Sequence, residues 1–200
     1  GHAVEFAHGA VALEDAGVTP SCGPILVTGA AGGVGTVAIS LLAKLGYEVV
    51  ASTGRMSEES FLRSLGATEV RSREGLSDPG KPLQREVWAG VVDCVGSHTL
   101  ANTLAQTRYG GAVTACGLAQ GADLPSSVMP FILRSVRLLG VDSVQAPLEL
   151  RRRAWQRLAS DLDLETLDSL CFDLSFDDVP AAAQDILKGS IRGRAIVALA

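Results

Sequence analysis

The sequence has few aromatic residues and no excess of basic residues. Phe, Trp and Tyr make up 4% of its 200 residues, and the 17 Lys and Arg are outnumbered by 22 Asp and Glu. The resulting formal net charge of −5 leaves no broad basic surface for a phosphodiester backbone. We therefore expect no nucleic-acid partner.

Cysteine is also scarce, and its spacing matches no known metal or disulfide motif. Cys22, Cys94, Cys116 and Cys171 are scattered, without a C-x-x-C pair or the Cys/His spacing of a zinc site. This pattern indicates reduced thiols, so we expect a cytoplasmic protein with no metal site.

Long apolar runs are missing as well. The stretches 37–45 and 128–133 are far shorter than the roughly 20 apolar residues that span a bilayer. No secretory signal is visible at the start, where Gly1 and His2 resemble the remnant of a purification tag. We expect no membrane partner.

The sequence does contain a regular alternation of apolar strands and amphipathic helices between residues 24 and 139. Several strand patterns, such as Val91–Val95, are almost continuously apolar, which is typical of parallel strands covered on both faces. The alternation predicts an α/β fold with a doubly wound parallel sheet. The expected strands are Ile25–Thr28, Glu48–Ser52, Glu69–Arg71, Val91–Val95, Ala112–Cys116 and Leu138–Val141.

The helices and the tail complete the expected organisation. We predict a lead-in helix within residues 1–23, a dinucleotide-binding domain over 24–146 and a C-terminal helix and return segment over 147–200. Residues 72–81 are polar, with Gly and Pro, and are interpreted as a surface loop. The other expected elements are helices Thr36–Leu45, Ser57–Leu65, Leu148–Leu162 and Asp177–Lys188 and strands Cys171–Leu174 and Ala195–Leu199.

A glycine-rich segment joins the first expected strand to the first expected helix. Its glycines follow the order G-x-x-G-x-x-G, at Gly29, Gly32 and Gly35, with the small Ala30 beside the first. Such a loop lets backbone N–H groups and the positive end of the helix dipole approach a pyrophosphate. Its place between strand and helix predicts a dinucleotide site.

The end of the second strand indicates which dinucleotide binds. NAD sites usually place Asp or Glu there, about 20 residues beyond the glycines, to hold the ribose hydroxyls. This sequence has Ser52, Thr53, Gly54 and Arg55 instead, and Arg71 and Arg73 follow the third strand. Hydroxyls and arginines suit a 2′-phosphate, so the residues favour NADP(H) over NAD(H).

Two dehydrogenase families share this glycine pattern. The short-chain family needs a Tyr-x-x-x-Lys pair, but Tyr47 is followed four residues later by Ala51, and Tyr109 by Val113. The chain instead resembles the zinc-free branch of the medium-chain dehydrogenase/reductase superfamily, in its quinone oxidoreductase-like and acryloyl-CoA reductase-like members. The segments that carry the resemblance are Ala12–Val18, Val27–Gly35, Ser64–Ala67, Tyr109–Gly111, Ala115–Leu118, Val128–Arg134 and Leu139–Val144.

The resemblance implies a set of cofactor contacts and an arrangement of domains. It covers nearly all of this chain but about two-thirds of a family member, because the N-terminal GroES-like catalytic domain of the family is absent. The implied contacts are Gly32, Gly33 and Val34 at the pyrophosphate, Ser52, Thr53, Arg55 and Arg73 at the 2′-phosphate, Cys94, Val95, Gly96, Gly117 and Leu118 along the cofactor, Asp142 and Ser143 at the nicotinamide end, and Arg194 nearby.

The resemblance also implies an activity. Family members transfer hydride from NADPH to an α,β-unsaturated carbonyl, such as the enoyl group of acryloyl-CoA, or to a quinone, and the cofactor carries the chemistry. The sequence identifies no proton donor. An alternative function is a non-catalytic NADPH-binding module or sensor. The apolar strand near Leu138–Val141 is expected at the edge of the sheet, where it would pair with a second copy in a homodimer.

Overall fold

The structure, a computed structural model, describes residues 3–142 and 144–198. Gly1, His2, Ser143, Ala200 and Leu199, the last residue of the expected final strand, lie outside the described residues. The expected contact of Ser143 is therefore not placed.

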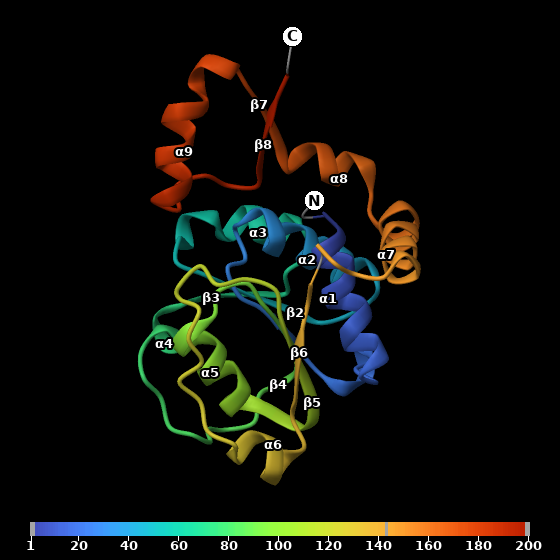
Figure 1. Cartoon of the computed structure of the whole chain (residues 1–200), viewed down its shortest axis with the longest axis vertical. Coiled ribbons are helices and arrows are strands. Elements are labelled where there is room, and N and C mark those ends of the chain that lie inside the picture. The colour runs from blue at the N-terminus through green and yellow to red at the C-terminus, as the bar shows by residue number, and fades with distance from the viewer. Residues whose placement is uncertain (1–2, 143, 199–200) are drawn as a thin grey trace.

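Six parallel strands form the central sheet, in the order β3-β2-β1-β4-β5-β6 (Figure 1). This order confirms the predicted doubly wound sheet, because it reverses direction between β1 and β4, where such folds bind ligands. β6 lies at one edge, as expected. The strands are β1 (Ile25–Val27), β2 (Val49–Thr53), β3 (Glu69–Ser72), β4 (Trp88–Asp93), β5 (Thr107–Ala115) and β6 (Arg137–Gly140).

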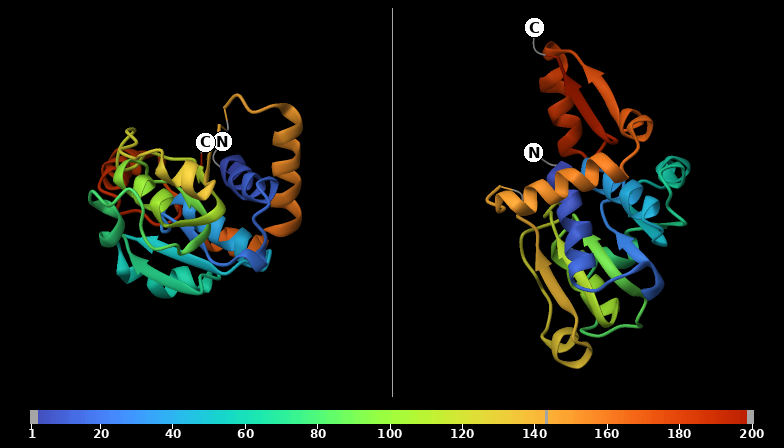
Figure 2. Two further views of the ribbon diagram at one scale, coloured as in Figure 1. Left: turned by 90° about the horizontal axis from the view of Figure 1, so that it is seen from below. Right: turned by 90° about the vertical axis from the view of Figure 1, so that its right-hand side faces the viewer.

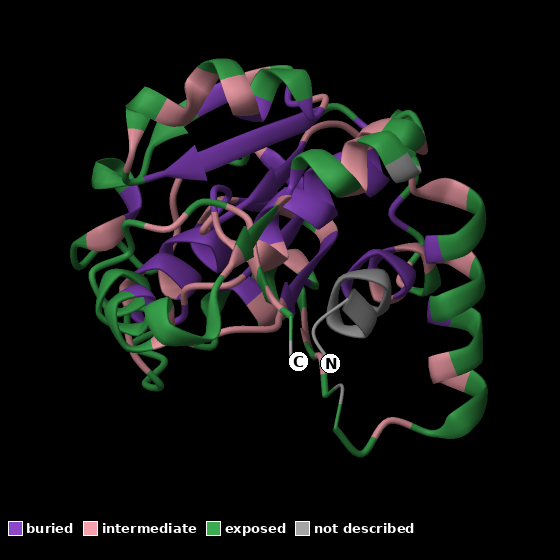
Figure 3. Cartoon of the chain, turned by 90° about the horizontal axis from the view of Figure 1, so that it is seen from above, coloured by how far each residue is buried: buried purple, intermediate pink, exposed green. Residues whose placement is uncertain are grey.

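Helices cover both faces of the sheet, and each face has its own apolar cluster. One cluster lies under α1 (Ala3–Asp15), α2 (Gly33–Lys44), α3 (Glu59–Ser64) and α7 (Leu148–Asp161). The other lies under α4 (Glu74–Ser77), α5 (Ser97–Gln106) and α6 (Met129–Arg134). Figure 3 shows the buried residues gathered in the sheet and in the helices against it. Three short 3-10 helices are η1 (Pro20–Cys22), η2 (Met56–Glu58) and η3 (Phe176–Asp178).

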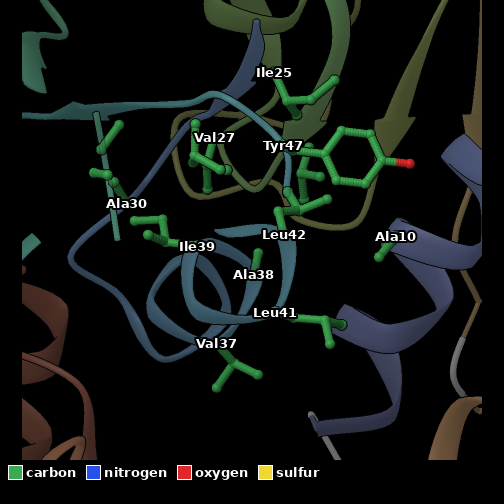
Figure 4. Packing of buried hydrophobic residues seen from close by; sticks show 14 of the residues in the cluster. Ala10, Ile25, Val27, Ala30, Val37, Ala38, Ile39, Leu41, Leu42 and Tyr47 are labelled. Carbon is green, nitrogen blue, oxygen red and sulfur yellow. The ribbon is translucent and has the colours of Figure 1, made fainter. Parts of the chain in front are cut away.

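The first helix after the glycine loop is buried on nearly every side. Ile39 and Leu42 of α2 lie under Ile25 and Val27 of β1, while Leu41 points towards α1 (Figure 4). A helix that is apolar all round has neighbours on several faces, here the sheet, α1 and α7. This packing fixes the N-terminus of α2 at the carboxyl ends of the strands.

Several predicted boundaries were wrong. The expected loop 72–81 contains the helical turn α4, because Leu76 is buried against the second cluster. The expected helix Ser57–Leu65 begins as η2 and becomes α3 at Glu59. Helix α2 begins at Gly33, earlier than the apolar periodicity indicated, because its first turn belongs to the glycine loop.

The tail forms a small lobe beside the sheet domain. β7 (Cys171–Leu174) and β8 (Arg194–Val197) pair in parallel, and α9 (Val179–Leu187) connects them, so the lobe is a βαβ unit with its own sheet. α8 (Leu164–Ser169) precedes it. Figure 2 shows this lobe projecting beyond the sheet domain, with α7 packed across α1. None of the described helices is long and apolar enough to cross a membrane.

The lobe touches the sheet domain through the segment before β8. The amide of Gly193 donates to the carbonyl of Ala31 in the glycine loop (3.3 Å). The guanidinium of Arg192 lies 4.3 Å from the ring centre of Phe61 and 3.3 Å from a carboxylate oxygen of Glu58. These contacts bring residues 186–195 back to the strand ends.

Candidate functional site

A cleft of about 800 Å³ opens at the carboxyl ends of β1, β2 and β4, between the sheet domain and the returning segment. It lies at the strand-order reversal, where doubly wound sheets bind their ligands. Its lining residues are Thr28, Gly29, Ala31, Gly32, Gly33, Ser52, Thr53, Gly54, Arg55, Arg73, Val95, Thr99, Ala119, Ile186, Lys188, Gly189, Ser190, Ile191, Gly193, Arg194 and Ala195.

The glycine loop forms one wall of the cleft. Gly29 adopts φ +61°, a left-handed conformation that glycine reaches without strain. A Cβ on Gly35 would stand 2.6 Å from the Cα of Ala30, so only glycine lets α2 begin this close to β1. Gly32 is the N-cap of α2 and supplies no side chain, which leaves the first amides of the helix without a side-chain cap. Helix N-termini of this kind suit an anion such as a pyrophosphate.

The end of β2 and the turn after β3 form the cationic end of the cleft. Among the described residues, two buried side-chain polar atoms lack a hydrogen-bond partner, and they are Ser52 Oγ and Arg55 Nη1. The other terminal nitrogen of Arg55 donates to the carbonyl of Ile191 (3.1 Å), which fixes the guanidinium. Arg73 lies across Gly54, where an added Cβ would stand 2.8 Å from its Nε. The unpaired donors of Ser52 and Arg55, beside the second arginine Arg73, fit a 2′-phosphate.

Arg71, which was expected to add positive charge beside the 2′-phosphate, contacts other residues instead. Its guanidinium pairs with Glu69 and lies 5.2 Å from the ring centre of Trp88. Strand alternation alone would place Arg71 and Arg73, two residues apart, on the same face. β3 ends at Ser72, however, and Arg73 belongs to the turn that begins α4, so its side chain takes another direction. Of these two arginines, Arg73 alone lines the cleft.

The turns after β4 and β5 form the opposite wall. Val95 lines the cleft directly, and Cys94 and Gly96 flank it in the same turn. Gly117 and Leu118 follow β5 and lie against that turn, because a Cβ on Gly96 would stand 3.3 Å from the Cα of Leu118. The expected residues Cys94, Gly96, Gly117 and Leu118 therefore support the wall without lining the cleft.

The remaining expected residues differ in position. Arg194 lines the cleft, with one guanidinium nitrogen 3.4 Å from the carbonyl oxygen of Gly33. Val34 is in the first turn of α2, half-buried in the core rather than on the cleft. Asp142 is exposed after β6, and its carboxylate accepts from the amides of Val144 and Gln145. The expected nicotinamide contact at Asp142 is thus outside this cleft.

Sequence reasoning missed most of the wall that the lobe provides. Ile186, Lys188, Gly189 and Ser190 line the cleft, although they follow the glycine loop by about 150 residues. Thr28, Thr99 and Ala119 were also missed. The Gly-x-x-x-Gly spacing of Gly189 and Gly193, both with positive φ, was a local signal of a tight turn after a helix.

The fold and the cleft define a nucleotide-binding domain of the doubly wound class. A model of the zinc-binding dehydrogenase family matches residues 33–160, and the chain belongs to that family. The described residues contain no cluster of three His, Cys, Asp or Glu side chains suited to a metal ion.

Relatives of known name share this fold at high identity. The acrylyl-CoA reductase AcuI of Ruegeria pomeroyi is 52% identical over 94% of this chain and 57% of its own length. A crystal structure of Escherichia coli YhdH with bound NADPH is 50% identical, with a TM-score of 0.95, over 98% of this chain and 61% of that one.

A third relative has a different cofactor. The putative quinone oxidoreductase YhfP of Bacillus subtilis is 47% identical over 94% of this chain and 57% of its own length. Its crystal structure has NAD bound, with a TM-score of 0.92 at 45% identity over 98% of this chain and 60% of that chain. These relatives confirm the resemblance to acryloyl-CoA reductase-like and quinone oxidoreductase-like enzymes. The chain spans about 57% of the length of the curated relatives it matches.

Proposed function

We propose that the chain is the NADP(H)-binding part of a reductase. The observation that carries this proposal is the pair of unpartnered donors, Ser52 Oγ and Arg55 Nη1, next to Arg73. A buried donor without a partner costs about 1–3 kcal/mol, which a bound phosphate oxygen would recover. No Asp or Glu lines the cleft to repel that phosphate. The E. coli relative, crystallised with NADPH, supports the same cofactor.

Three groups of residues contact three different parts of the cofactor in this proposal. Ser52, Arg55 and Arg73 hold the 2′-phosphate, and the first amides of α2, starting at Gly33, face the pyrophosphate. The amide of Gly32 donates to the carbonyl of Gly29 (3.0 Å), so Gly32 contributes by carrying no side chain. Cys94, Val95, Gly96, Gly117, Leu118 and Arg194 shape the path towards the nicotinamide. When bound, NADPH supplies the hydride, and the residues of this chain bind and orient it.

The substrate class follows from the relatives. We propose that the parent enzyme reduces an α,β-unsaturated carbonyl, such as an enoyl-CoA of the acryloyl type, or a quinone, as the names of the R. pomeroyi and B. subtilis relatives suggest. The residues described here supply the cofactor half of that reaction. We assign no proton donor to them.

Assembly and location complete the proposal. β6 is at the edge of the sheet, and its Leu138 and Leu139 are half-buried, so a second copy would extend the sheet across this edge as a homodimer. The four cysteines form no disulfide among the described residues, and we propose the reducing cytoplasm as the location.

Calorimetric titration with NADPH and NADH tests the cofactor. We expect tighter binding of NADPH, and a loss of about tenfold or more in Arg73→Ala, because a charge-assisted hydrogen bond contributes about 1.5–3 kcal/mol. NADH binding should stay unchanged in that variant. Arg71→Ala is the matched control, since Arg71 is two residues away and engaged with Glu69.

Three outcomes would contradict parts of the proposal. Equal affinity for NADPH and NADH would refute the binding of the 2′-phosphate by Ser52, Arg55 and Arg73. No binding of either cofactor by the folded chain would refute dinucleotide binding. NADPH binding by the full-length parent without reduction of acryloyl-CoA or quinone would favour a non-catalytic binding module or sensor.

A further inference from the structure

A buried carboxylate joins the two strands between which the sheet reverses. Asp93, the last residue of β4, is fully buried, and the proposed cofactor contacts do not use it. The hydroxyl of Thr28, directly after β1, donates to Asp93 Oδ1 at 2.7 Å. The cleft opens between β1 and β4, so this hydrogen bond crosses its base.

The second oxygen of Asp93 holds the turn that follows its own strand. Asp93 Oδ2 accepts from the amides of Gly96 at 2.8 Å and Val95 at 3.3 Å. Two consecutive residues of this turn, Gly96 and Ser97, have positive φ, of 76° and 47°. A non-glycine residue with positive φ is strained and persists only where its surroundings hold it. The Asp93 carboxylate is one such restraint.

The same network also ties the turn to the glycine loop. Thr28 Oγ1 accepts from the amide of Cys94 at 3.0 Å while it donates to Asp93, so one hydroxyl joins both sides. The two loops approach closely, because a Cβ on Gly29 would stand 3.3 Å from the side chains of Cys94 and Val95. A displaced turn would therefore change the space beside the pyrophosphate-binding wall.

The turn after β4 also contacts a third loop. Gly96 pairs with Gly121 in an isolated bridge, and a Cβ on Gly96 would stand 2.3 Å from the carbonyl oxygen of Gly121. The loop before Gly121 carries Ala119, which lines the cleft. A shift of the turn at 94–97 would therefore move both the glycine loop and the loop that carries Ala119.

We propose that Asp93 is a positioning residue for the cofactor, which acts through Thr28 and the amides of Val95 and Gly96 to set the separation of the loops that flank the pyrophosphate and nicotinamide half. This inference rests on the proposed NADP(H) function. The adenosine end, at Ser52, Arg55 and Arg73, lies at the end of β2 and in the turn after β3, away from the hydrogen bonds of Asp93.

The experiment compares two ligands in variants of Thr28. Thr28→Val has nearly the same shape but leaves Asp93 Oδ1 and the amide of Cys94 without their partner, whereas Thr28→Ser keeps the hydroxyl. NADPH probes the whole cleft, and 2′-AMP probes its adenosine end alone. We expect Thr28→Val to weaken NADPH at least about tenfold and 2′-AMP less than threefold, with Thr28→Ser close to the unchanged chain.

Thr114→Val is the matched control for loss of a buried hydroxyl. Thr114 is fully buried on β5, and its hydroxyl donates to the carbonyl of Val91 (3.1 Å), away from the cleft lining. We expect this variant to lose thermal stability and to bind both ligands normally. Thermal unfolding of every variant shows whether it is folded at the titration temperature.

Asp93→Asn is the second test. An Asn side chain has one oxygen, so its NH2 group must face either the hydroxyl of Thr28 or the two turn amides, and one side loses its acceptor. We therefore expect it to reproduce the selective loss of NADPH. NADPH binding by Thr28→Val within threefold of the unchanged chain would overturn the inference, as would equal weakening of NADPH and 2′-AMP. Failure of the unchanged, folded chain to bind NADPH would instead refute the proposed function on which the inference rests.

Discussion

Gly54 is the position where a single carboxylate should reverse the preference for NADPH. It follows β2, about where NAD-binding sheets of this class place an acidic residue. Its backbone does not adopt a left-handed conformation, so Gly54→Asp carries no backbone penalty. The new side chain would meet the guanidinium of Arg73, whose Nε lies 2.8 Å from the added Cβ. Arg73 must therefore shift and pair with the new carboxylate.

The size of the effect follows from these charges. Two unit charges about 4 Å apart interact by about 4 kcal/mol at an effective dielectric constant of 20. Gly54 is exposed, so solvent screening reduces this to about 2–3 kcal/mol. We expect NADPH affinity to fall about 30-fold to 150-fold. NADH affinity should stay constant or rise, because the carboxylate can accept from the ribose hydroxyls.

Titration of both cofactors measures the ratio of their affinities. Gly75→Asp is the control, since it adds the same charge on α4 at a position with open space around an added Cβ and outside the cleft lining. We expect that control to leave the ratio unchanged. A Gly54→Asp ratio within threefold of the unchanged chain would refute the assignment of the 2′-phosphate to Arg73.

Three further predictions concern stability and are measured by urea denaturation. Gly35→Ala should cost about 1–3 kcal/mol through overpacking against backbone, and an unchanged free energy of unfolding would contradict the close approach of α2. Arg157→Ala breaks a half-buried ion-pair network that joins α1 and α7, and it should lower the free energy of unfolding by about 1–2 kcal/mol. Arg153→Ala breaks an exposed ion pair and should lower it by less than about 1 kcal/mol. Equal losses would contradict the view that burial strengthens the Arg157 pairs. Burial raises the pKa of Asp93 above its value in the unfolded chain, so protonated Asp93 favours the folded state. This contribution to the free energy of unfolding is complete below about pH 3.9 and is lost as the pH rises through the folded-state pKa. Thr28→Val removes a bond to the ionised form and raises that pKa further, so its cost should grow from pH 4 to pH 7, and a cost independent of pH would contradict this account.

Much of the fold was predictable because its signals are local. The six strands of the main sheet were each located from short apolar runs, with errors of up to five residues at their ends. The errors occur where tertiary contacts override the pattern. α4 forms in an expected polar loop because Leu76 finds a buried site, and the expected strand 91–95 ends at Asp93, whose carboxylate holds the turn that follows.

The candidate site was predictable in part for the same reason. Gly29, Gly32 and Gly35 are close in sequence, and their roles depend on one turn and one helix, so their spacing is informative. The pair Arg71 and Arg73 shows the limit. Both lie near the end of the same strand pattern, but Arg71 is within β3 and packs against Trp88, whereas Arg73 is in the turn after β3 and lines the cleft.

The sequence alone thus determined the class of sheet, the glycine loop and the absence of a carboxylate at the end of β2, because each depends on residues that are neighbours in the chain. Tertiary structure decided which segments meet across the cleft. Residues 186–195 return to the glycine loop, and Asp93 meets Thr28 across 65 positions. Such contacts leave no periodic pattern in the sequence, since the first depends on where α7 and the small lobe direct the chain and the second on the pairing of β1 with β4.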